Sequence, residues 1–145
     1  MKYTYDYPRL SLTVDALIFM KDIDGTKVLL IQRDKAPYEG KWALPGGFVD
    51  MEETLEESIK RELKEETNLE SIELFQFHSF SKLRRDPRGR TVSVVFYGFT
   101  SKDNSNIIAG DDARDAKWFD INDFPELAFD HTEIIEKAIE EIIIK

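Results

Sequence analysis

Residues 47–69, GFVDMEETLEESIKRELKEETNL, form the segment from which the rest of the sequence can be interpreted. Thr54 and Glu57 have the spacing of a capping box, a pair whose side chains accept hydrogen bonds from each other's backbone N–H groups. A helix is therefore predicted from this point to about Thr67. At about 3.6 residues per turn its apolar side chains share one face, which we expect to pack on a hydrophobic core. These side chains are Leu55, Ile59 and Leu63.

Some acidic side chains of this predicted helix lie close to the same face. Glu62, Glu65 and Glu66 fall within an arc of about 100° that overlaps the edge of the apolar stripe, so they would border the core. Glu62 and Glu66 are also four residues apart, and like charges at this spacing destabilise a helix by roughly 0.2–0.5 kcal/mol. A divalent cation between the two carboxylates would remove this repulsion. A metal site is therefore the favoured interpretation.

A solvated charged face is the alternative interpretation of so acidic a helix. Three features argue against it. Residues 44–47, Leu-Pro-Gly-Gly, are predicted to form neither strand nor helix, and their glycines would let the backbone approach a ligand closely. Glu53 lies just before the cap, where a loop could return it to the helix. The opposite side of the helix already carries charge for solubility, from Glu57, Lys60 and Lys64.

The spacing of these residues resembles the Nudix box, G-x5-E-x7-R-E-U-x-E-E-x-G-U, in which U is a bulky aliphatic residue. Asn68 departs from the pattern, since the family has glycine there. After glycine, asparagine is the residue best suited to the left-handed conformation that ends a helix. The resemblance implies a Nudix-type α/β/α sandwich, with a mixed sheet between helices, as one domain over residues 1–145. The matching residues are Gly47, Glu53, Arg61, Glu62, Leu63, Glu65, Glu66 and Leu69.

The resemblance also implies a metal-dependent activity. Nudix hydrolases cleave a diphosphate linked to another moiety, through attack of water on phosphorus assisted by Mg²⁺ or Mn²⁺. Such ions neutralise the phosphate oxygens, and carboxylates are the hard ligands that they prefer. By the family's pattern, Glu62, Glu66 and the backbone carbonyl of Gly46 would be metal ligands. Glu65 would be a further ligand or the general base.

Two acidic segments are candidates for the remaining catalytic roles. By resemblance, Glu53 would act through water or orient Arg61, and Arg61 would support the carboxylate cluster by pairing with Glu53. The family also draws its general base from a later loop. Asp111 and Asp112, with Asp115 shortly after them, are therefore the alternative to the helix glutamate. The structural interpretation of this loop is turn chemistry, because Asp is favoured beside Gly.

Residues 82–90, KLRRDPRGR, concentrate positive charge between two predicted strands. One interpretation is a hairpin loop that charge keeps soluble. The other is a phosphate clamp, because guanidinium groups pair bidentately with phosphate oxygens. Together with residues 42–49 and 127–131, this segment resembles the ADP-ribose pyrophosphatase branch of the family, which implies hydrolysis of ADP-ribose to AMP and ribose 5-phosphate. The substrate-binding residues implied are Arg33 at the nucleotide end, Gly47, and Arg85 and Arg88 at the phosphates or terminal ribose.

Other polar and aromatic residues have less specific interpretations. Asp15, the one charge in the first predicted strand, is either an outward-facing residue or a ligand. His131 follows a helix-capping Asp130, which favours a local structural role over that of an acid or ligand. An aromatic ring could stack on adenine, although most rings are expected in the core. The candidates for stacking are Phe19, Trp42 and Phe80.

The composition limits the class of protein. With 145 residues, 41% of them hydrophobic and none of them cysteine, the chain can bury a core without disulfides or thiolate metal sites. The N-terminus has no apolar signal stretch and no run is as long as a membrane span, so a cytoplasmic protein without membrane contact is expected. A net charge of -9 disfavours broad contact with nucleic acid and suits a protein that binds cations and a small nucleotide. The tyrosine-rich start is compatible with a homodimer.

Two rival functions share the expected fold. Some regulators of this fold sense ADP-ribose or sugars, but they carry a winged-helix domain, for which these 145 residues leave no room, and their boxes are often eroded. A house-cleaning hydrolase of nucleoside triphosphates would share the box and differ in its pocket and loops. Hydrophobic patterns predict the elements around the box. They are strands at 10–19, 27–32, 71–81 and 91–100, a short strand near Trp118, and a final helix capped by Asp130.

Overall fold

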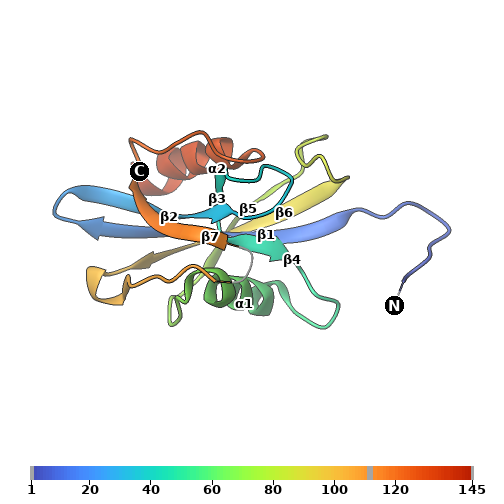
Figure 1. Ribbon diagram of the computed structural model, residues 1–145, viewed down its shortest axis with the longest axis horizontal. Helices are drawn as coiled ribbons and strands as arrows, with labels where there is room; N and C mark the ends of the chain where they lie inside the picture. The colour runs from blue at the N-terminus through green and yellow to red at the C-terminus, as the bar shows by residue number, and fades with distance from the viewer. Residues whose placement is uncertain (1, 111–112, 145) are drawn as a thin grey trace.

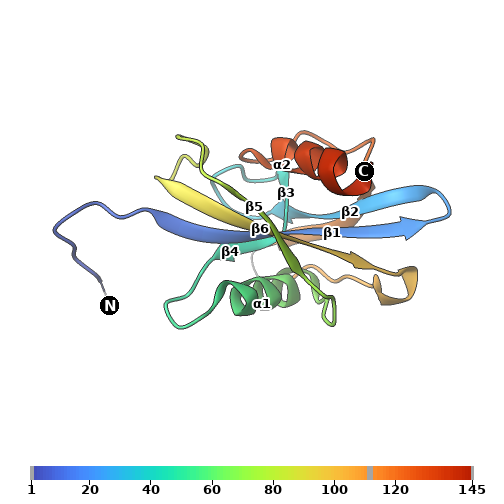
Figure 2. The same ribbon diagram turned by 180° about the vertical axis from the view of Figure 1, so that it is seen from behind.

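The computed structural model of the protein describes residues 2–110 and 113–144. In this part of the chain a seven-stranded sheet lies between helices α1 and α2, as Figures 1 and 2 show from opposite sides. The expected α/β/α sandwich with a mixed sheet is confirmed. Neither of these helices is long and apolar enough to cross a membrane. The elements are β1 (Ser11–Asp22), β2 (Gly25–Arg33), β3 (Trp42–Ala43), β4 (Gly46–Phe48), α1 (Leu55–Thr67), β5 (Phe75–Phe80), β6 (Thr91–Thr100), the short helix η1 (Lys102–Asn104), β7 (Ala113–Asp120), α2 (His131–Ala138) and the π-helical turn η2 (Ile139–Ile143).

Strand β1 organises the sheet because it pairs with three other strands. It runs parallel to β6 along most of its length and antiparallel to β2 at its C-terminal end. Toward its N-terminal end its antiparallel partner is β4 instead, in a register that places Asp15 opposite Gly46. The backbone N–H of Ala16 donates to the carbonyl of Pro45 at 2.8 Å and joins the two regions. Strand β1 therefore changes its antiparallel partner, from β4 to β2, beyond Asp15.

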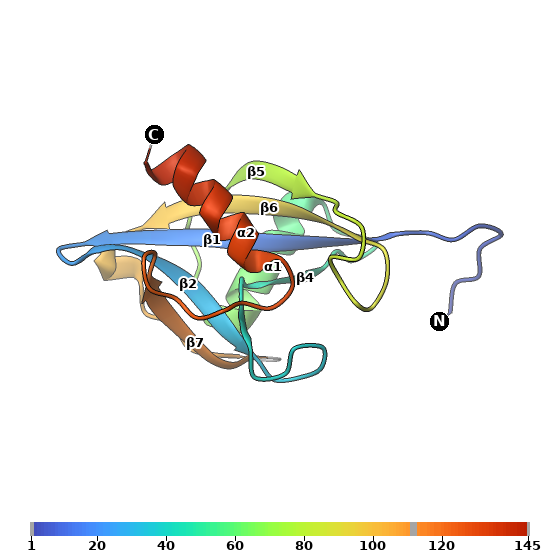
Figure 3. The ribbon, with the colours of Figure 1, turned by 90° about the horizontal axis from the view of Figure 1, so that it is seen from above.

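Strand β1 is buried on both faces, which accounts for its nearly continuous apolar sequence. Alternate side chains belong to different cores, since successive residues of a strand point to opposite faces. Figure 3 shows α2 lying across β1 and β6. The core under α2 contains Leu17, Phe19, Val95, Ile134 and Ile135. The core under α1 contains Val14, Ala16, Ile18, Ile59 and Leu63.

Helix α1 begins and ends as predicted. The Thr54 side chain accepts a hydrogen bond from the N–H of Glu57 at 3.1 Å, and the Glu57 carboxylate accepts one from the N–H of Thr54 at 2.9 Å. Asn68 follows the helix with a φ of 66°, the left-handed conformation expected at this position. These two ends fix which helix face is turned to the sheet.

Three element predictions are wrong in detail. Gly46 and Gly47, in the segment 44–47 that was predicted to be neither strand nor helix, form strand β4 together with Phe48. Glycine lets the backbone pack here, where a Cβ on Gly46 would lie 2.1 Å from the Val14 carbonyl oxygen. The strand predicted at 71–81 covers only β5, and Ser71 has a φ of 60° that no strand residue adopts. Asp130 precedes α2 but its side chain makes no capping hydrogen bond.

Candidate active site

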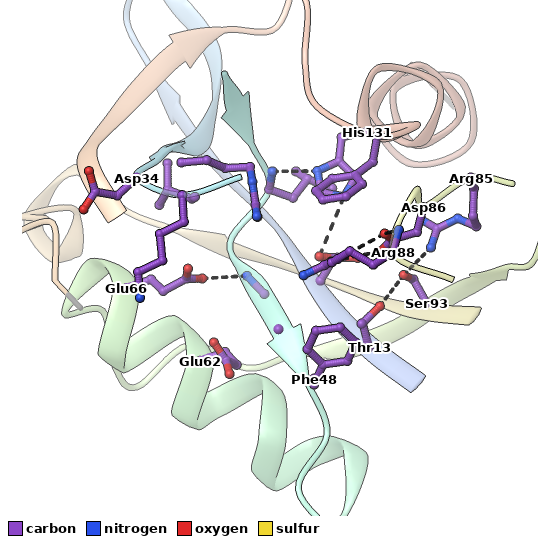
Figure 4. A pocket seen from close by; sticks show the side chains of 18 of the residues that line it. Thr13, Asp34, Phe48, Glu62, Glu66, Arg85, Asp86, Arg88, Ser93 and His131 are labelled. Atoms are coloured by element: carbon purple, nitrogen blue, oxygen red, sulfur yellow. Dashed lines mark hydrogen bonds and ion pairs between the residues drawn. The ribbon is translucent and has the colours of Figure 1, made fainter. Parts of the chain in front are cut away.

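A cavity of about 420 Å³ opens where β1 changes its partner from β2 to β4. Figure 4 shows that its walls come from elements far apart in the sequence, including α1, β4, the loop between β5 and β6, and the start of α2. Glu53 and Glu65 do not line the cavity and instead contact Arg61. The predicted site residues that line it are Arg33, Gly46, Gly47, Arg61, Glu62, Glu66, Arg85 and Arg88.

The glycine pair of β4 lies directly against two carboxylates of α1. The N–H of Gly46 donates to Glu66 Oε1 at 2.7 Å. A Cβ on Gly47 would lie 2.5 Å from Glu62 Oε1, so the position accepts only glycine without displacing that carboxylate. Glu62 and Glu66 reach the same strand because they are about one helical turn apart. The packing of β4 on α1 thus explains the spacing in the sequence between the glycine pair and these two glutamates.

The carbonyl of Gly46 faces the same side as its N–H. In the antiparallel pair of β1 and β4, Gly46 lies opposite Asp15, between the hydrogen bonds that join Ala16 to Pro45 and Val49 to Leu12. A residue at such a position directs both its N–H and its C=O away from the partner strand. The carbonyl oxygen of Gly46 is therefore directed to the side on which Glu66 lies.

Burial makes these carboxylates reluctant to carry charge. Glu66 is only 8% exposed. Burial raises the pKa of Glu66 to about 8, against the opposing effect of the Gly46 hydrogen bond and with further help from the charges of Glu62 and Asp15. Burial likewise raises the pKa of Glu62, although its hydrogen bond with Arg61 opposes this. A bound cation would favour the ionised form of both groups.

Arg61 connects the acidic side chains around α1. Its guanidinium donates to both carboxylate oxygens of Glu53, at 2.6 and 2.9 Å, and to Glu62 Oε1 at 2.8 Å. The hydrogen bond from Arg61 lowers the pKa of Glu53. The pairing of Arg61 with Glu53 is the one that the family resemblance implies. Its contribution to the reaction stays a prediction.

Glu65 lies apart from the other two glutamates. Its side chain is 41% exposed, on the outer side of Arg61, whose Nη1 donates to it at 3.2 Å. Within residues 2–110 and 113–144, no three Asp, Glu or His side chains lie close enough together to form a ready-made ion site. The structure thus brings Glu62 and Glu66 together at Gly46 but leaves Glu65 outside.

Asp15 and His131 are buried in the part of the cavity under α2. His131 Nδ1 accepts a hydrogen bond from the N–H of Leu44 at 3.0 Å, and Nε2 lies 3.8 Å from Asp15 Oδ1. Burial lowers the pKa of His131 to about 3, so the ring is neutral and its proton is on Nε2. The contact that His131 makes is therefore with a residue far away in the chain and not the local one beside a helix cap that the sequence favoured. Burial raises the pKa of Asp15 to about 7, and the interpretation of Asp15 as an outward-facing residue is wrong.

Arg85 and Asp130 form a buried ion pair between the loop after β5 and the start of α2. The guanidinium donates to both carboxylate oxygens of Asp130, at 2.8 and 2.6 Å, and to the Ser93 hydroxyl at 2.7 Å. The two side chains are 3% and 10% exposed. This pair explains why Asp130 caps no helix. Because most of the donors of Arg85 are engaged within the protein, its direct contact with phosphate stays a prediction.

The alternative general bases, Asp111 and Asp112, lie outside the described residues. Gly110, which precedes them, donates its N–H to the backbone carbonyl of Glu66 at 3.2 Å. Gly110 therefore lies beside the C-terminal half of α1. Asp115 lies in β7 and is not among the described residues that line the cavity.

Several cavity residues were not selected from the sequence. Phe48 and Phe129 line the cavity, whereas Phe19, Trp42 and Phe80 pack on the core under α2. The signal for the first two was their position in the chain, next to the glycine pair and next to the Asp-His dipeptide. No comparable signal marks the remaining ones. Among these are Thr13, Asp34, Lys35, Asp50 and Ser93.

Comparisons with known proteins agree with this geometry. Residues 11–141 match the NUDIX domain. The chain is 44% identical over 130 residues to the ADP-ribose pyrophosphatase of Methanocaldococcus jannaschii, which covers 90% of this chain and 73% of that protein. It is 36% identical to the ADPR responsive transcriptional repressor NtrR of Acinetobacter baylyi over 92% of this chain, and it spans 54% of the repressor's length.

A solved structure shows the same fold with a nucleotide bound. The NUDIX domain of Shewanella oneidensis NrtR complexed with ADP ribose superimposes with a TM-score of 0.86 and 36% sequence identity. The match covers 95% of this chain and 94% of that domain. Since the domain match spans almost all of the sequence and the box glutamates meet the glycine pair in the cavity, this protein belongs to the Nudix family.

Proposed function

We propose that this protein hydrolyses ADP-ribose to AMP and ribose 5-phosphate with the help of Mg²⁺ or Mn²⁺. One observation carries the proposal: Glu62 and Glu66 lie against the glycine pair in a cavity whose other walls hold arginine and lysine side chains. A diphosphate needs both, because its oxygens bind cations and pair with guanidinium groups. The relative named ADP-ribose pyrophosphatase and the domain solved with ADP ribose support this choice of substrate.

The donor atoms suit a hard divalent cation. Glu62, Glu66 and the carbonyl oxygen of Gly46 would hold it, since charged and neutral oxygens are the ligands that such ions prefer. The bound ion would neutralise phosphate oxygens and lower the pKa of a water molecule. Buried carboxylates with raised pKa values, directed at the same strand, fit this role.

Arginine side chains would position the substrate around this centre. Arg61 would hold Glu62 in place, as its 2.8 Å contact does in the free protein. Arg88, whose side chain is 39% exposed, would reach the phosphates, and Arg33 would lie at the nucleotide end. Arg85 would act chiefly through its pair with Asp130, which holds the loop that carries Arg88.

Glu65 is our choice for the general base. Its contact with Arg61, at 3.2 Å, is longer than the contacts that Arg61 makes with Glu53 and Glu62, so Glu65 can turn away most easily. Asp111 and Asp112 stay the alternative. Replacing each of the three by its amide and comparing the pH dependence of turnover distinguishes them, because loss of the base removes the acidic limb of the profile.

A second function, sensing of ADP-ribose without turnover, is favoured by the likeness to the repressor. Hydrolysis is favoured by the complete set of box glutamates in this chain. A panel of ADP-ribose, UDP-glucose and nucleoside triphosphates, with Mg²⁺ or with EDTA, tests both. We expect AMP release from ADP-ribose that requires the metal. Binding of ADP-ribose without AMP release would identify a sensor, and preference for triphosphates would identify a house-cleaning hydrolase.

A further inference from the structure

Aromatic and guanidinium groups form a stack along one wall of the cavity. The Cζ atom of Arg88 lies 4.8 Å from the centre of the Phe48 ring and 5.3 Å from that of Phe129. The Cζ atom of Arg33 also lies over the Phe129 ring, at 5.0 Å. Figure 4 shows Arg88 extending over Phe48, on the side away from α1. The flat guanidinium of Arg88 thus lies between two phenyl rings.

One ring of this stack is held firmly and the other components are exposed. Phe129 packs edge-on against Tyr38, with ring centres 4.9 Å apart. Phe48 is 43% exposed, and the Arg88 side chain is 39% exposed with its charge paired to Asp86 at 2.8 Å. Phe48 and Arg88 belong to neither core, and the buried carboxylate of Asp86 also accepts a hydrogen bond from the backbone N–H of Arg88, at 2.9 Å, which does not depend on where the guanidinium lies.

We propose that the space between Phe48 and Phe129, the base slot, binds the nucleobase of the nucleotide, and that Arg88 fills the slot when it is empty. A guanidinium is planar and stacks on aromatic faces, as a nucleobase does. When the base enters, Arg88 turns from the rings toward the phosphates, with which it can pair bidentately. The assignment rests on the proposed function, because it requires a nucleotide substrate.

The position of the base slot fits a nucleotide that extends to the carboxylates. Phe48 follows Gly47, whose backbone lies against Glu62, so the slot adjoins the proposed metal ligands. Among the described residues that line the cavity, Phe48 and Phe129 alone have phenyl rings. A base bound in this cavity therefore stacks on these rings.

Binding of etheno-AMP, a fluorescent AMP analogue whose emission falls when its base stacks, measures entry into the slot. In the presence of Mg²⁺ we expect saturable quenching with the parent protein. Phe48→Leu should abolish most of the quenching and weaken binding by about fivefold or more, the lower end of what base stacking contributes. Phe129→Leu should do the same, which keeps the test valid if one variant folds poorly.

The matched control is Phe75→Leu, which removes a ring that is 46% exposed outside the cavity. It should bind etheno-AMP as the parent does. Ribose 5-phosphate has no base, so Phe48→Leu should leave its affinity unchanged. Equal weakening of etheno-AMP and ribose 5-phosphate, or quenching retained in both slot variants, would overturn the assignment.

If Arg88 moves in this way, its removal should change the affinities for two ligands in opposite directions. Arg88→Ala empties the slot and removes a phosphate partner, so adenosine should bind more tightly and AMP more weakly than to the parent. Weaker binding of both would show that Arg88 stays in the stack and would overturn the displacement. AMP release from ADP-ribose is measured separately. Its absence would remove the proposed function while quenching of etheno-AMP still decides the slot.

Discussion

The two sides of the cavity balance their charges in different ways. On the α1 side, Glu62 and Glu66 are close together against β4, and burial raises the pKa of both. On the α2 side, Arg85 and Asp130 neutralise each other in a bidentate pair. The difference teaches that burial makes charge unfavourable on the α1 carboxylates, against the opposing effects of Arg61 and Gly46, whereas the two charges of the α2 pair offset each other. The first suits catalysis and the second suits a fixed shape.

The largest effect is expected from breaking the ion pair on the α2 side. Arg85→Met leaves the carboxylate of Asp130 buried without its partner, which should lower the free energy of unfolding by about 3–5 kcal/mol. Urea denaturation measures this change. Replacing the pair together, with Arg85→Met and Asp130→Leu, should restore most of the stability, because an apolar pair avoids the unpaired charge. A single variant as stable as the parent would show that the pair does not hold this side of the cavity.

On the α1 side the expected effect is on turnover and not on folding. Glu66→Gln removes a proposed metal ligand and should lower kcat by about a hundredfold or more, at least as much as loss of a residue that supports metal ligands. It also removes a carboxyl group whose ionisation is unfavourable in this buried position, so the thermal midpoint in EDTA should stay the same or rise. Glu56→Gln, on an exposed turn of the same helix, is the matched control and should be fully active. Unfolding of the Glu66 variant would instead indicate a purely structural residue.

The remaining effects are opposite pH dependences of the two sides in metal-free protein. The pKa of Glu66 is raised from 4.5 to about 8, so its contribution to stability falls as the pH rises through this interval. The pKa of His131 is lowered from 6.5 to about 3, so its contribution is present above pH 6.5 and is lost as the pH falls toward 3. Urea denaturation across this range, comparing the parent with Glu66→Gln and with His131→Gln, isolates each residue.

We expect the stabilities of the two variants, each relative to the parent, to change in opposite directions as the pH rises. Glu66→Gln should gain stability relative to the parent as the pH rises, and added Mg²⁺ should abolish that gain. His131→Gln should lose stability relative to the parent as the pH rises from 3 to 6.5. If the free energies of unfolding of the parent and of either variant changed with pH in parallel, this would contradict the assigned burial of that side chain.

The α1 side could be predicted from sequence because its geometry is local. Thr54 and Asn68 fix the two ends of one helix, and the period of that helix then fixes the direction of Glu62 and Glu66. Glu65, on the same arc, has its side chain outside the cavity, and its catalytic role stays a prediction. An arc of about 100° on a helix is wide enough to include both the edge of a core and open solvent.

The α2 side could not be predicted in the same way. Arg85 belongs to a run of basic residues, but nothing in the sequence indicates that Asp130, 45 residues later, pairs with it. The Asp-His dipeptide likewise suggested a helix cap, whereas Asp130 pairs with Arg85 and His131 accepts a hydrogen bond from Leu44. Such partners are chosen by the packing of separate elements.

The sequence by itself determined the family, the sandwich of helices around a mixed sheet, and the helix that presents two glutamates, since these depend on caps and hydrophobic periods within one segment. Only the tertiary structure decided that the glycine pair forms a strand, that Asp15 and His131 are buried together, and that Phe48 and Phe129 enclose Arg88. The physical reason is that strand register and burial are set by contacts between residues far apart in the chain.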